Sequence, residues 1–316
     1  MAVARKEGPM AKRLFFGHHY VRNGPAPGAS ASPERLRKQI EALLDGGWEF
    51  LTCGEIAGRM VGGRPLPERV ASISFDDGLK DQYVNAFPIL KELGVPATFF
   101  IITCTLKDEL PPVIGFQILI DRIGVERMVL EVLPDAFAGT PYLDLLDPNR
   151  YDASGRKMGE PPEMRRIKWM FNHWPSQAFK RDMLAEMFRR CLGESAQGTM
   201  AREWFMSAED ICELQKAGME IGSHSVTHPP FDVSGLAEIM TELVESASKI
   251  GETTGHSPVS FAWPFGGRFR PAVQELAGRF YSSAWNYFSA LTTMPEGDYR
   301  FTNVPRLHEA KILPEL

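Results

Sequence analysis

The sequence predicts an α/β protein in which strands and helices alternate around a parallel sheet. Residues 95–102 form a nearly continuous apolar run, which is typical of a strand covered on both faces. A β-favouring run precedes it at residues 70–75, and apolar residues at helical spacing lie between the two at 83–93. Strand, helix and strand at this spacing indicate a βαβ unit. The same alternation returns after residue 205.

Length and charge narrow the class of protein. With 316 residues, of which 44% are hydrophobic, the chain can bury a full core. The net charge of −5 and the pI near 5.9 disfavour a nucleic-acid partner. No apolar stretch approaches the roughly 20 residues of a membrane helix, so we expect no membrane span.

The cysteines and the N-terminus predict a cytoplasmic protein. The four cysteines are scattered and form no CxxC pair, which disfavours a zinc ribbon and fits reduced thiols. Residues 1–13 are polar and basic, and we expect a disordered tail there. The apolar patch that follows, at 14–16, is too short for the core of a signal peptide.

The first third of the chain contains four predicted strands and three predicted helices. Ser32 and Pro33 are a favourable helix start, and Gly46 with Gly47 ends that helix. The predicted strands are 14–21, 49–52, 70–75 and 95–102, and the predicted helices are 33–45, 54–60 and 83–93.

Residues 104–205 interrupt this pattern, and we predict a mainly helical insertion. Helices are expected at 115–133 and 176–192, with a loop-like stretch at 134–162. A structureless loop of this length inside one domain would be unusual. The basic and aromatic segment 165–171 is interpreted either as a solvated helix face above a core stripe or as a lid over an anionic or sugar substrate.

The alternation then resumes. Ser207 and Asp210 predict a helix start with a side-chain cap, and Ser234 is the expected cap of a later helix. The predicted strands are 219–223, 259–263 and 281–285, and the predicted helices are 208–217, 236–250 and 271–277. The last stretch, 301–308, ends with Arg306 and His308.

Two adjacent carboxylates, Asp76 and Asp77, end the strand at 70–75, and Gly78 allows the chain to turn. Loops at the C-terminal ends of strands carry the polar sites of α/β barrels. Because neighbouring residues on a strand point to opposite faces, we expect the two carboxylates to serve different tasks. An ordinary Asp-Asp-Gly turn is the alternative.

His224 and His228 form a second candidate site. In helical zinc peptidases the first histidine of such a pair is followed by a glutamate, but Ser225 follows it here. Pro229 and Pro230 also disfavour a long helix, so a short turn at a strand end is expected. Two histidines and one aspartate leave open positions for a catalytic metal, and the second aspartate can act as a base. Zinc fits these ligands, as does non-haem Fe(II).

Three ordered motifs resemble the polysaccharide deacetylase (NodB-homology, carbohydrate esterase family 4-like) family. They are Phe75-Asp76-Asp77-Gly78, His224-Ser225-Val226-Thr227-His228 and Phe261-Ala262-Trp263-Pro264-Phe265-Gly266. His19-Tyr20-Val21 and Ala97-Thr98-Phe99-Phe100 also look like strands of that family.

The resemblance implies a distorted (β/α) barrel of about seven strands, here a single domain over 14–316 with the insertion at about 104–205. It implies metal-dependent removal of an N-acetyl group from an amino sugar. Asp76 resembles the catalytic base, and Asp77, His224 and His228 resemble the ligands of one divalent metal, Zn²⁺ first and Co²⁺ or Ni²⁺ as alternatives. The backbone N–H of Phe265 would bind the oxyanion.

The chain also departs from the family pattern. The arginine that opens the third motif in peptidoglycan deacetylases, where it orients the catalytic aspartate, is missing, and Trp263 stands where many relatives have tyrosine. His308, after Arg306 and Leu307, is the one late candidate for the general acid; a surface residue is the alternative.

The remaining predicted substrate contacts lie near the motifs. His19 would lie at a strand end beside the aspartates, either as a substrate contact or as a packed strand histidine. Trp263 and Pro264 are further candidates, because Pro264 would fix the turn that aims the Phe265 N–H.

Several functions remain open at this stage. The substrate is an N-acetylated amino sugar in a polysaccharide, a glycoside or a nucleotide- or lipid-linked precursor. Deformylation or hydrolysis of another small amide would use the same groups. A carbohydrate-binding protein that kept the fold and lost catalysis is a further alternative. A non-haem iron oxygenase is disfavoured because such enzymes usually have double-sheet β folds. The sequence leaves a homo-oligomer open.

Overall fold

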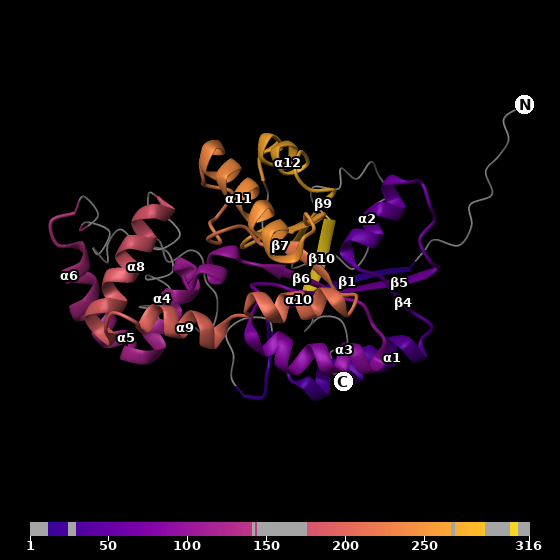
Figure 1. Cartoon of the computed structure of the whole chain (residues 1–316), viewed down its shortest axis with the longest axis horizontal. Coiled ribbons are helices and arrows are strands. Elements are labelled where there is room, and N and C mark those ends of the chain that lie inside the picture. Colours follow the sequence, from indigo (N-terminus) through magenta and orange to yellow (C-terminus); the bar gives the residue numbers. More distant parts are fainter. Residues whose placement is uncertain are drawn as a thin grey trace, which may run out of the picture.

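The computed structural model describes residues 12–24, 30–140, 143, 176–266, 269–287 and 304–308. Its central feature is a parallel sheet of eight strands (Figure 1). The strands are β1 (Lys12–His18), β4 (Glu49–Phe50), β5 (Arg69–Phe75), β6 (Thr98–Ile101), β7 (Glu220–Ser223), β8 (Ser260–Ala262), β9 (Ser283–Tyr287) and β10 (Val304–His308).

Seven of these strands close into a barrel. The order β1-β10-β9-β8-β7-β6-β5 is completed by a further pairing of β1 with β5, which runs from Lys12 opposite Arg69 to His18 opposite Phe75. β4 pairs with the beginning of β5, and β6 pairs with its end. The predicted seven-stranded distorted barrel is confirmed. A separate pair, β2 (Tyr20–Val21) and β3 (Ser30–Ala31), lies outside it.

Helices cover the outside of the barrel. α1 and α3 lie side by side against one part of the sheet, and α11 and α12 pack together over another (Figure 1). These helices are α1 (Pro33–Asp45), α2 (Cys53–Val61), α3 (Phe87–Leu93), α10 (Ala208–Lys216), α11 (Leu236–Thr254) and α12 (Pro271–Ala277).

Local chemistry explains where several helices begin. The Ser32 hydroxyl accepts the Arg35 N–H at the start of α1. Thr52 and Glu55 form a reciprocal capping box on α2, and α10 has the same device. The helix after the Asp pair begins instead as a π-helix, η1 (Gln82–Ala86), before α3. Pro88 in the first turn of α3 has no N–H to continue a regular ladder.

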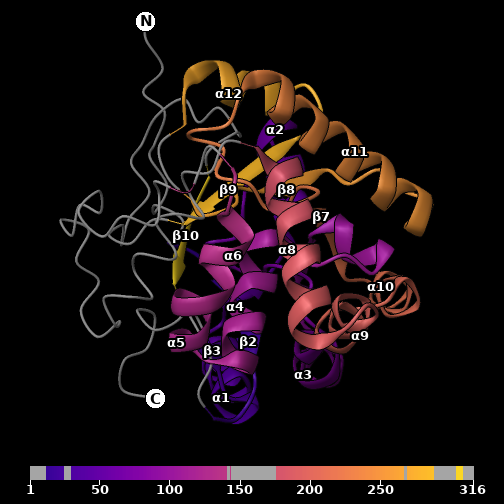
Figure 2. The ribbon, with the colours of Figure 1, turned by 90° about the vertical axis from the view of Figure 1, so that its left-hand side faces the viewer.

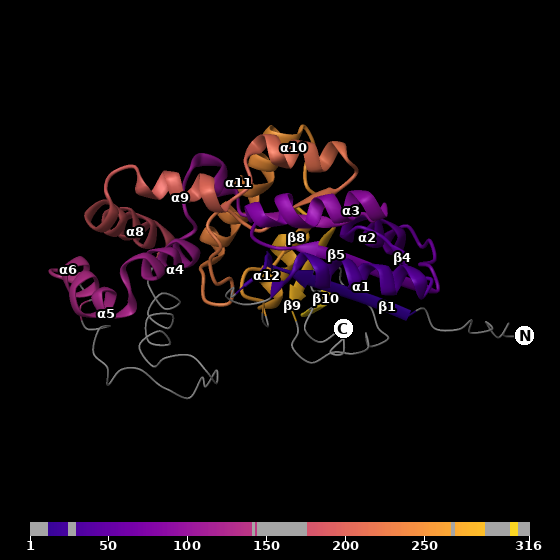
Figure 3. The ribbon, with the colours of Figure 1, turned by 90° about the horizontal axis from the view of Figure 1, so that it is seen from below.

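The insertion helices stand on one side of the barrel (Figures 1 and 3), and they are in front in Figure 2. They have their own apolar cluster, which includes Phe116, Leu184 and Phe188. Tyr20 on β2 and Leu79, shortly after β5, also belong to it. These segments are η2 (Thr103–Lys107), α4 (Pro112–Ile123), α5 (Val125–Arg127), η3 (Met128–Val132), α6 (Leu133–Phe137), α8 (Gln177–Leu192) and α9 (Ala196–Trp204).

Some predicted boundaries change. Lys12 and Arg13 belong to β1 and not to the tail, because β1 runs in full register with β5 from its first residue. The cap of α11 is Gly235, not Ser234. The first residues of the predicted loop 134–162 continue a helix to Phe137. The remaining tail and the segment 165–171 lie outside the described residues. None of the described helices is long and apolar enough to cross a membrane.

Candidate metal and catalytic site

The candidate site lies at one rim of the barrel, where parallel strands end. Asp76 follows β5, His224 follows β7 and Trp263 follows β8. Because all barrel strands run in the same direction, their C-terminal ends meet at this rim. The three predicted motifs, which begin at residues 75, 224 and 261, therefore converge there.

Asp77, His224 and His228 form one cluster. Asp77 Oδ1 lies 3.5 Å from His224 Nε2 and 3.7 Å from His228 Nε2. The donor atoms of the three residues all lie within 4.8 Å of one another, and all three side chains are buried. The structure thus brings together the three residues that the sequence predicted as metal ligands.

The backbone at this rim adopts conformations that side-chain-bearing residues avoid. Among the described residues, five non-glycine residues have positive φ, and four of them belong to the motifs: Asp77 (74°), Ser225 (67°), His228 (58°) and Phe265 (62°). A left-handed conformation costs such a residue about 1–2 kcal/mol. Strain of this kind concentrates at functional sites, where the surrounding structure maintains it.

The donor chemistry fits a divalent metal. His224 Nδ1 donates to the Ala262 carbonyl at 2.8 Å, which leaves the Nε2 lone pair free as a ligand. Burial lowers the pKa of His224 and lowers that of His228 further, so both rings are neutral. Asp77 Oδ1 is buried and finds no hydrogen-bond donor in the described part of the chain. A cation at this point would satisfy that oxygen.

Asp77 and Asp76 have opposite electrostatic environments. Burial and the neighbouring charge of Asp76 raise the pKa of Asp77 to about 8. Burial alone would also raise the pKa of Asp76, but the charge and hydrogen bonds of Arg306 lower it to about 2. The two carboxylates therefore lie in different electrostatic environments, and their separate tasks stay a prediction.

Arg306 on β10 holds the Asp76 carboxylate. Its Nη1 donates to Oδ1 at 2.7 Å and its Nη2 to Oδ2 at 2.8 Å. Nη1 also donates to the Ser74 hydroxyl at 2.9 Å, and the guanidinium lies over the Phe100 ring. Arg306 and Asp76 are each 1% exposed. A planar bidentate pair fixes both the position and the plane of the carboxylate.

Phe265 lies in a turn that exposes its backbone. The Gly266 N–H donates to the Trp263 carbonyl at 3.2 Å, which closes a four-residue turn with Pro264 second and Phe265 third. A positive φ at the third position is the requirement of a type II turn. The Phe265 ring packs edge-on against His228 at 4.7 Å between centroids, so the turn adjoins the histidine cluster.

The other predicted residues have different positions. Trp263 is 1% exposed and stacks on Phe269 in the core, so its ring does not line the surface of the site. Pro264 is buried. His19 lies near enough to Asp76 and His228 to lower the pKa of both. His308 ends β10 opposite Gly17, but its side chain lies outside the described residues, and its role as acid stays a prediction.

Two contacts to Asp76 are not predicted by the motifs. The first is Arg306, although an arginine inside a short apolar strand is an unusual choice that signals a buried partner. The buried Gln82 donates through Nε2 to the His19 carbonyl at 2.7 Å and to the Asp76 carbonyl at 2.5 Å. It thereby ties two strand ends together, and no motif indicates it.

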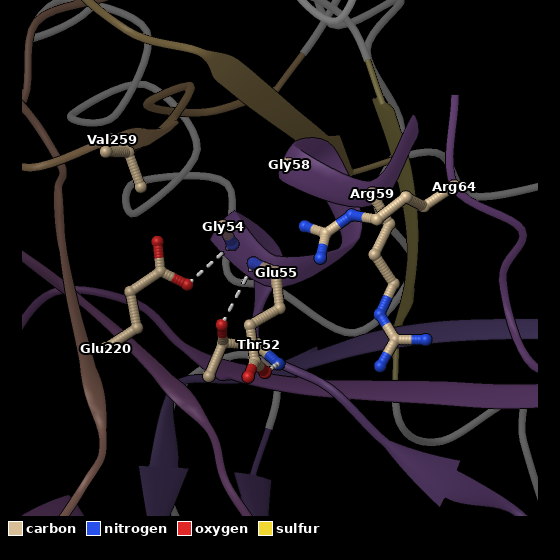
Figure 4. Close-up of a pocket in the computed structure, with 8 residues that line it drawn as sticks. All are labelled: Thr52, Gly54, Glu55, Gly58, Arg59, Arg64, Glu220 and Val259. Atoms are coloured by element: carbon tan, nitrogen blue, oxygen red, sulfur yellow. Dashed lines mark hydrogen bonds between the residues drawn. The ribbon is translucent and has the colours of Figure 1, made fainter. Parts of the chain in front are cut away.

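A cavity of about 420 Å³ lies away from this rim (Figure 4). It adjoins Glu220, the first residue of β7, and Val259, just before β8, together with the first turns of α2. Figure 4 shows Glu220 accepting the Gly54 N–H, a bond of 2.7 Å. None of the predicted site residues lines this cavity.

A family model identifies the motif-bearing parts of the chain. The model for polysaccharide deacetylases matches residues 63–130 and 192–279. These segments contain both aspartates, both histidines and the Phe265 turn.

Two curated relatives match a shorter part of the chain. The poly-β-1,6-N-acetyl-D-glucosamine N-deacetylase of Escherichia coli K12 is 34% identical over 70 residues, which are 22% of this chain and 10% of that protein. The enzyme of the same name from Staphylococcus aureus MSSA476 is 39% identical over 80 residues, 25% of this chain and 27% of that protein. The matches thus span about a quarter or less of each relative.

Solved structures match almost the whole chain. The Streptococcus pyogenes deacetylase PplD, in complex with acetate, aligns with a TM-score of 0.57 and 15% identity over 95% of this chain and 92% of that one. IcaB from Ammonifex degensii aligns with a TM-score of 0.57 and 18% identity over 94% and 91%. At these identities the likeness concerns the fold. Together with the family match, it shows that this chain belongs to the polysaccharide deacetylase family.

Proposed function

We propose that this protein is a metal-dependent hydrolase that removes the N-acetyl group from an amino sugar in a polysaccharide or oligosaccharide. The observation that carries the proposal is the buried Asp77–His224–His228 cluster beside an ionised Asp76 that Arg306 holds in place. Asp77 Oδ1 and the Nε2 atoms of the two histidines would hold the metal. When bound, a divalent metal polarises an amide carbonyl and makes a water molecule more acidic.

Asp76 is the base in this proposal. Its low pKa keeps the carboxylate ionised throughout the neutral range, so it is ready to accept the proton of the attacking water. Arg306 donates one hydrogen bond to each Asp76 oxygen. A carboxylate oxygen has a second lone pair, which can accept that proton. The bidentate contact holds the carboxylate still, because small displacements of a catalytic group can cost about 10²-fold in rate.

The Phe265 backbone N–H is the proposed donor to the oxyanion that develops on the acetyl carbonyl. Within the described residues, no hydrogen bond uses this N–H, and the turn that presents it is fixed by the Gly266 to Trp263 bond. A preorganised donor of this kind typically contributes about 10²–10³ in kcat.

The substrate class follows from chemistry and relatives together. The names of the E. coli and S. aureus relatives specify a polymer of N-acetylated glucosamine. Release of formate from an N-formyl sugar would use the same groups, so the leaving acid must be identified. A cytoplasmic location and a nucleotide- or lipid-linked substrate stay predictions.

The decisive experiment compares wild type with Asp76→Asn and, as a control, Asp182→Asn, an exposed aspartate on α8. Each purified chain is loaded with Zn²⁺, analysed for metal, and incubated with β-1,6-linked N-acetylglucosamine oligomers and with nucleotide-linked N-acetyl sugars. We expect acetate from wild type and the control, and a fall of about 10²–10⁴-fold in kcat for Asp76→Asn with the metal retained.

Three outcomes would contradict the proposal. Formate released in place of acetate would assign a deformylase. Binding of the oligomers without release of either acid would favour a carbohydrate-binding relative without catalysis. Wild-type protein that holds no metal after reloading would exclude the mechanism.

A further inference from the structure

The loop between the two histidine ligands has a conformation that its own sequence does not favour. His224 and His228 are four residues apart, but the chain between them is not helical. Ser225 and His228 both have positive φ without being glycine. Contacts from outside the loop must therefore hold it so that both Nε2 atoms face Asp77.

Glu242 on α11 supplies the main external contact. Its Oε2 accepts the N–H of Val226 at 2.7 Å and that of Thr227 at 2.9 Å. Its Oε1 accepts the Thr227 hydroxyl at 2.5 Å. One carboxylate thus binds three donors of Val226 and Thr227, two of the three residues that lie between the ligands. Bonds from N–H and O–H donors to an ionised carboxylate are among the stronger protein hydrogen bonds.

The opposite side of the loop is held by η2. Thr103 N–H donates to the Ser225 carbonyl at 3.1 Å, and Cys104 N–H donates to the Val226 carbonyl at 3.0 Å. α11 packs against both β7 and η2. The peptide groups of the loop are thus bound from two sides, by the carboxylate of Glu242 on one and by backbone donors on the other.

The surroundings of Glu242 indicate that it serves this loop. Its side chain is 5% exposed, and within the described residues no lysine or arginine pairs with it. Burial of a carboxylate without a cation is unfavourable unless hydrogen bonds compensate for the lost water. Among the described residues, the donors that compensate this carboxylate all belong to Val226 and Thr227.

We infer that Glu242 is a positioning residue that sets the metal affinity of the site by fixing the loop between His224 and His228. The inference rests on the proposed metal site. Without the carboxylate, the N–H groups of Val226 and Thr227 lose their acceptor. The loop then relaxes from its left-handed conformations, and the two Nε2 atoms no longer share one point with Asp77. Residues that support metal ligands in this way typically contribute about 10–100-fold to metal affinity.

The test measures Zn²⁺ affinity of the full chain by competition with a chromophoric chelator, and the thermal midpoint of the metal-free protein. Glu242→Leu removes all three acceptor contacts at similar volume. Glu242→Gln is the conservative variant, since its oxygen can accept both N–H groups while its amide donates to Thr227. Thr227→Val removes only the hydroxyl contact. Glu245→Gln, an exposed glutamate on the same helix, is the control.

We expect Glu242→Leu to weaken zinc binding by about 10–100-fold and Thr227→Val by about 2–10-fold. Glu242→Gln should recover most of the affinity lost in Glu242→Leu, and Glu245→Gln should equal wild type. A purely structural role would lower the metal-free thermal midpoint and leave the affinity of the folded chain unchanged.

Wild-type affinity in a folded Glu242→Leu chain would overturn the inference. If that variant does not fold, Thr227→Val decides, and affinity equal to wild type in it would overturn the inference in the same way. A wild-type chain that binds no zinc would instead overturn the proposed function on which the inference rests.

Discussion

Asp76 and Arg306 are 230 positions apart and form a buried bidentate ion pair, with both nitrogen–oxygen distances under 3 Å. They meet because β1 lies between their strands and pairs with β5 on one side and β10 on the other. The third motif of this chain lacks the arginine that opens the corresponding motif in the peptidoglycan deacetylases it resembles. Here a guanidinium from the last described strand holds the carboxylate of Asp76, the proposed base.

Replacement of Arg306 should affect both stability and turnover. Arg306→Met leaves the Asp76 charge buried without its partner, and removal of one member of such a pair typically costs about 3–5 kcal/mol in the free energy of unfolding. Arg306→Lys keeps the charge but loses the bidentate geometry, so we expect it to fold while kcat falls by about 10²-fold. Urea denaturation and acetate release measure the two effects.

Arg279→Met is the matched control, since Arg279 is exposed and pairs with Glu275 within α12 and the turn after it. It should change neither quantity. Equal stability of Arg306→Met and wild type would mean that the buried pair does not hold Asp76 in solution.

Metal binding should depend on pH through Asp77. Burial and the charge of Asp76 raise its pKa to about 8, above the ordinary value of 3.8. The folded chain therefore holds this proton more tightly than the unfolded chain does. The resulting stabilisation of the metal-free fold is complete below about pH 4, falls as the pH rises, and is lost above about pH 8. A metal must displace the Asp77 proton, whereas both histidines are already neutral.

We therefore expect the rise in thermal midpoint on addition of Zn²⁺ to grow between about pH 6 and pH 8. Calorimetry at about pH 7 in buffers of different ionisation enthalpy should show release of close to one proton on binding. A zinc effect that does not change over this range would argue against Asp77 as a ligand.

Loss of a histidine ligand should remove the metal without unfolding the chain. His224→Ala deletes one of three protein ligands and the 2.8 Å bond to the Ala262 carbonyl. We expect metal content near zero and no acetate release, with only a modest loss of stability. His256→Ala, an exposed histidine after α11, should retain the metal. Elemental analysis after dialysis distinguishes them, and a fully loaded His224→Ala chain would remove His224 from the ligand set.

Phe265 should act through its backbone. Its side chain is 46% exposed and its φ is 62°, a conformation that glycine adopts without steric cost. We expect Phe265→Gly to lose less than about 10-fold in kcat and to keep its stability, because relief of strain offsets the added chain entropy. A loss of more than about 100-fold, measured by acetate release, would assign the function to the ring and not to the N–H.

Local sequence predicted most helices and strands well. Helix starts at Ser32 and Ser207 depend on a side chain and a backbone N–H three residues later, so a few neighbouring residues determine them. Several observed strand ends differ from the predicted ones by one to three residues, because the partner strands decide where a hydrogen-bonded ladder begins. The first residues of β1 are the clearest case, since a basic segment joined the sheet through its register with β5.

The cluster of proposed metal ligands was predictable for the same reason. Asp76 and Asp77 are adjacent, and His224 and His228 lie within five residues, so each motif carries its chemistry in one short segment. The position of each motif at the C-terminal end of a parallel strand then brought the motifs to one rim. The ring of Trp263, in contrast, packs into the core, which depends on the helix α12 region around Phe269.

The sequence by itself determined the alternation of strands and helices, the family, and the two short motifs that cluster Asp77, His224 and His228. Only the tertiary structure decided that Arg306 orients Asp76 and that Glu242 holds the histidine loop. Both contacts join residues that no periodicity or spacing relates, since strand order and helix packing bring them together. Buried hydrogen bonds of this kind form only where the fold excludes water, and that exclusion is a property of the assembled barrel.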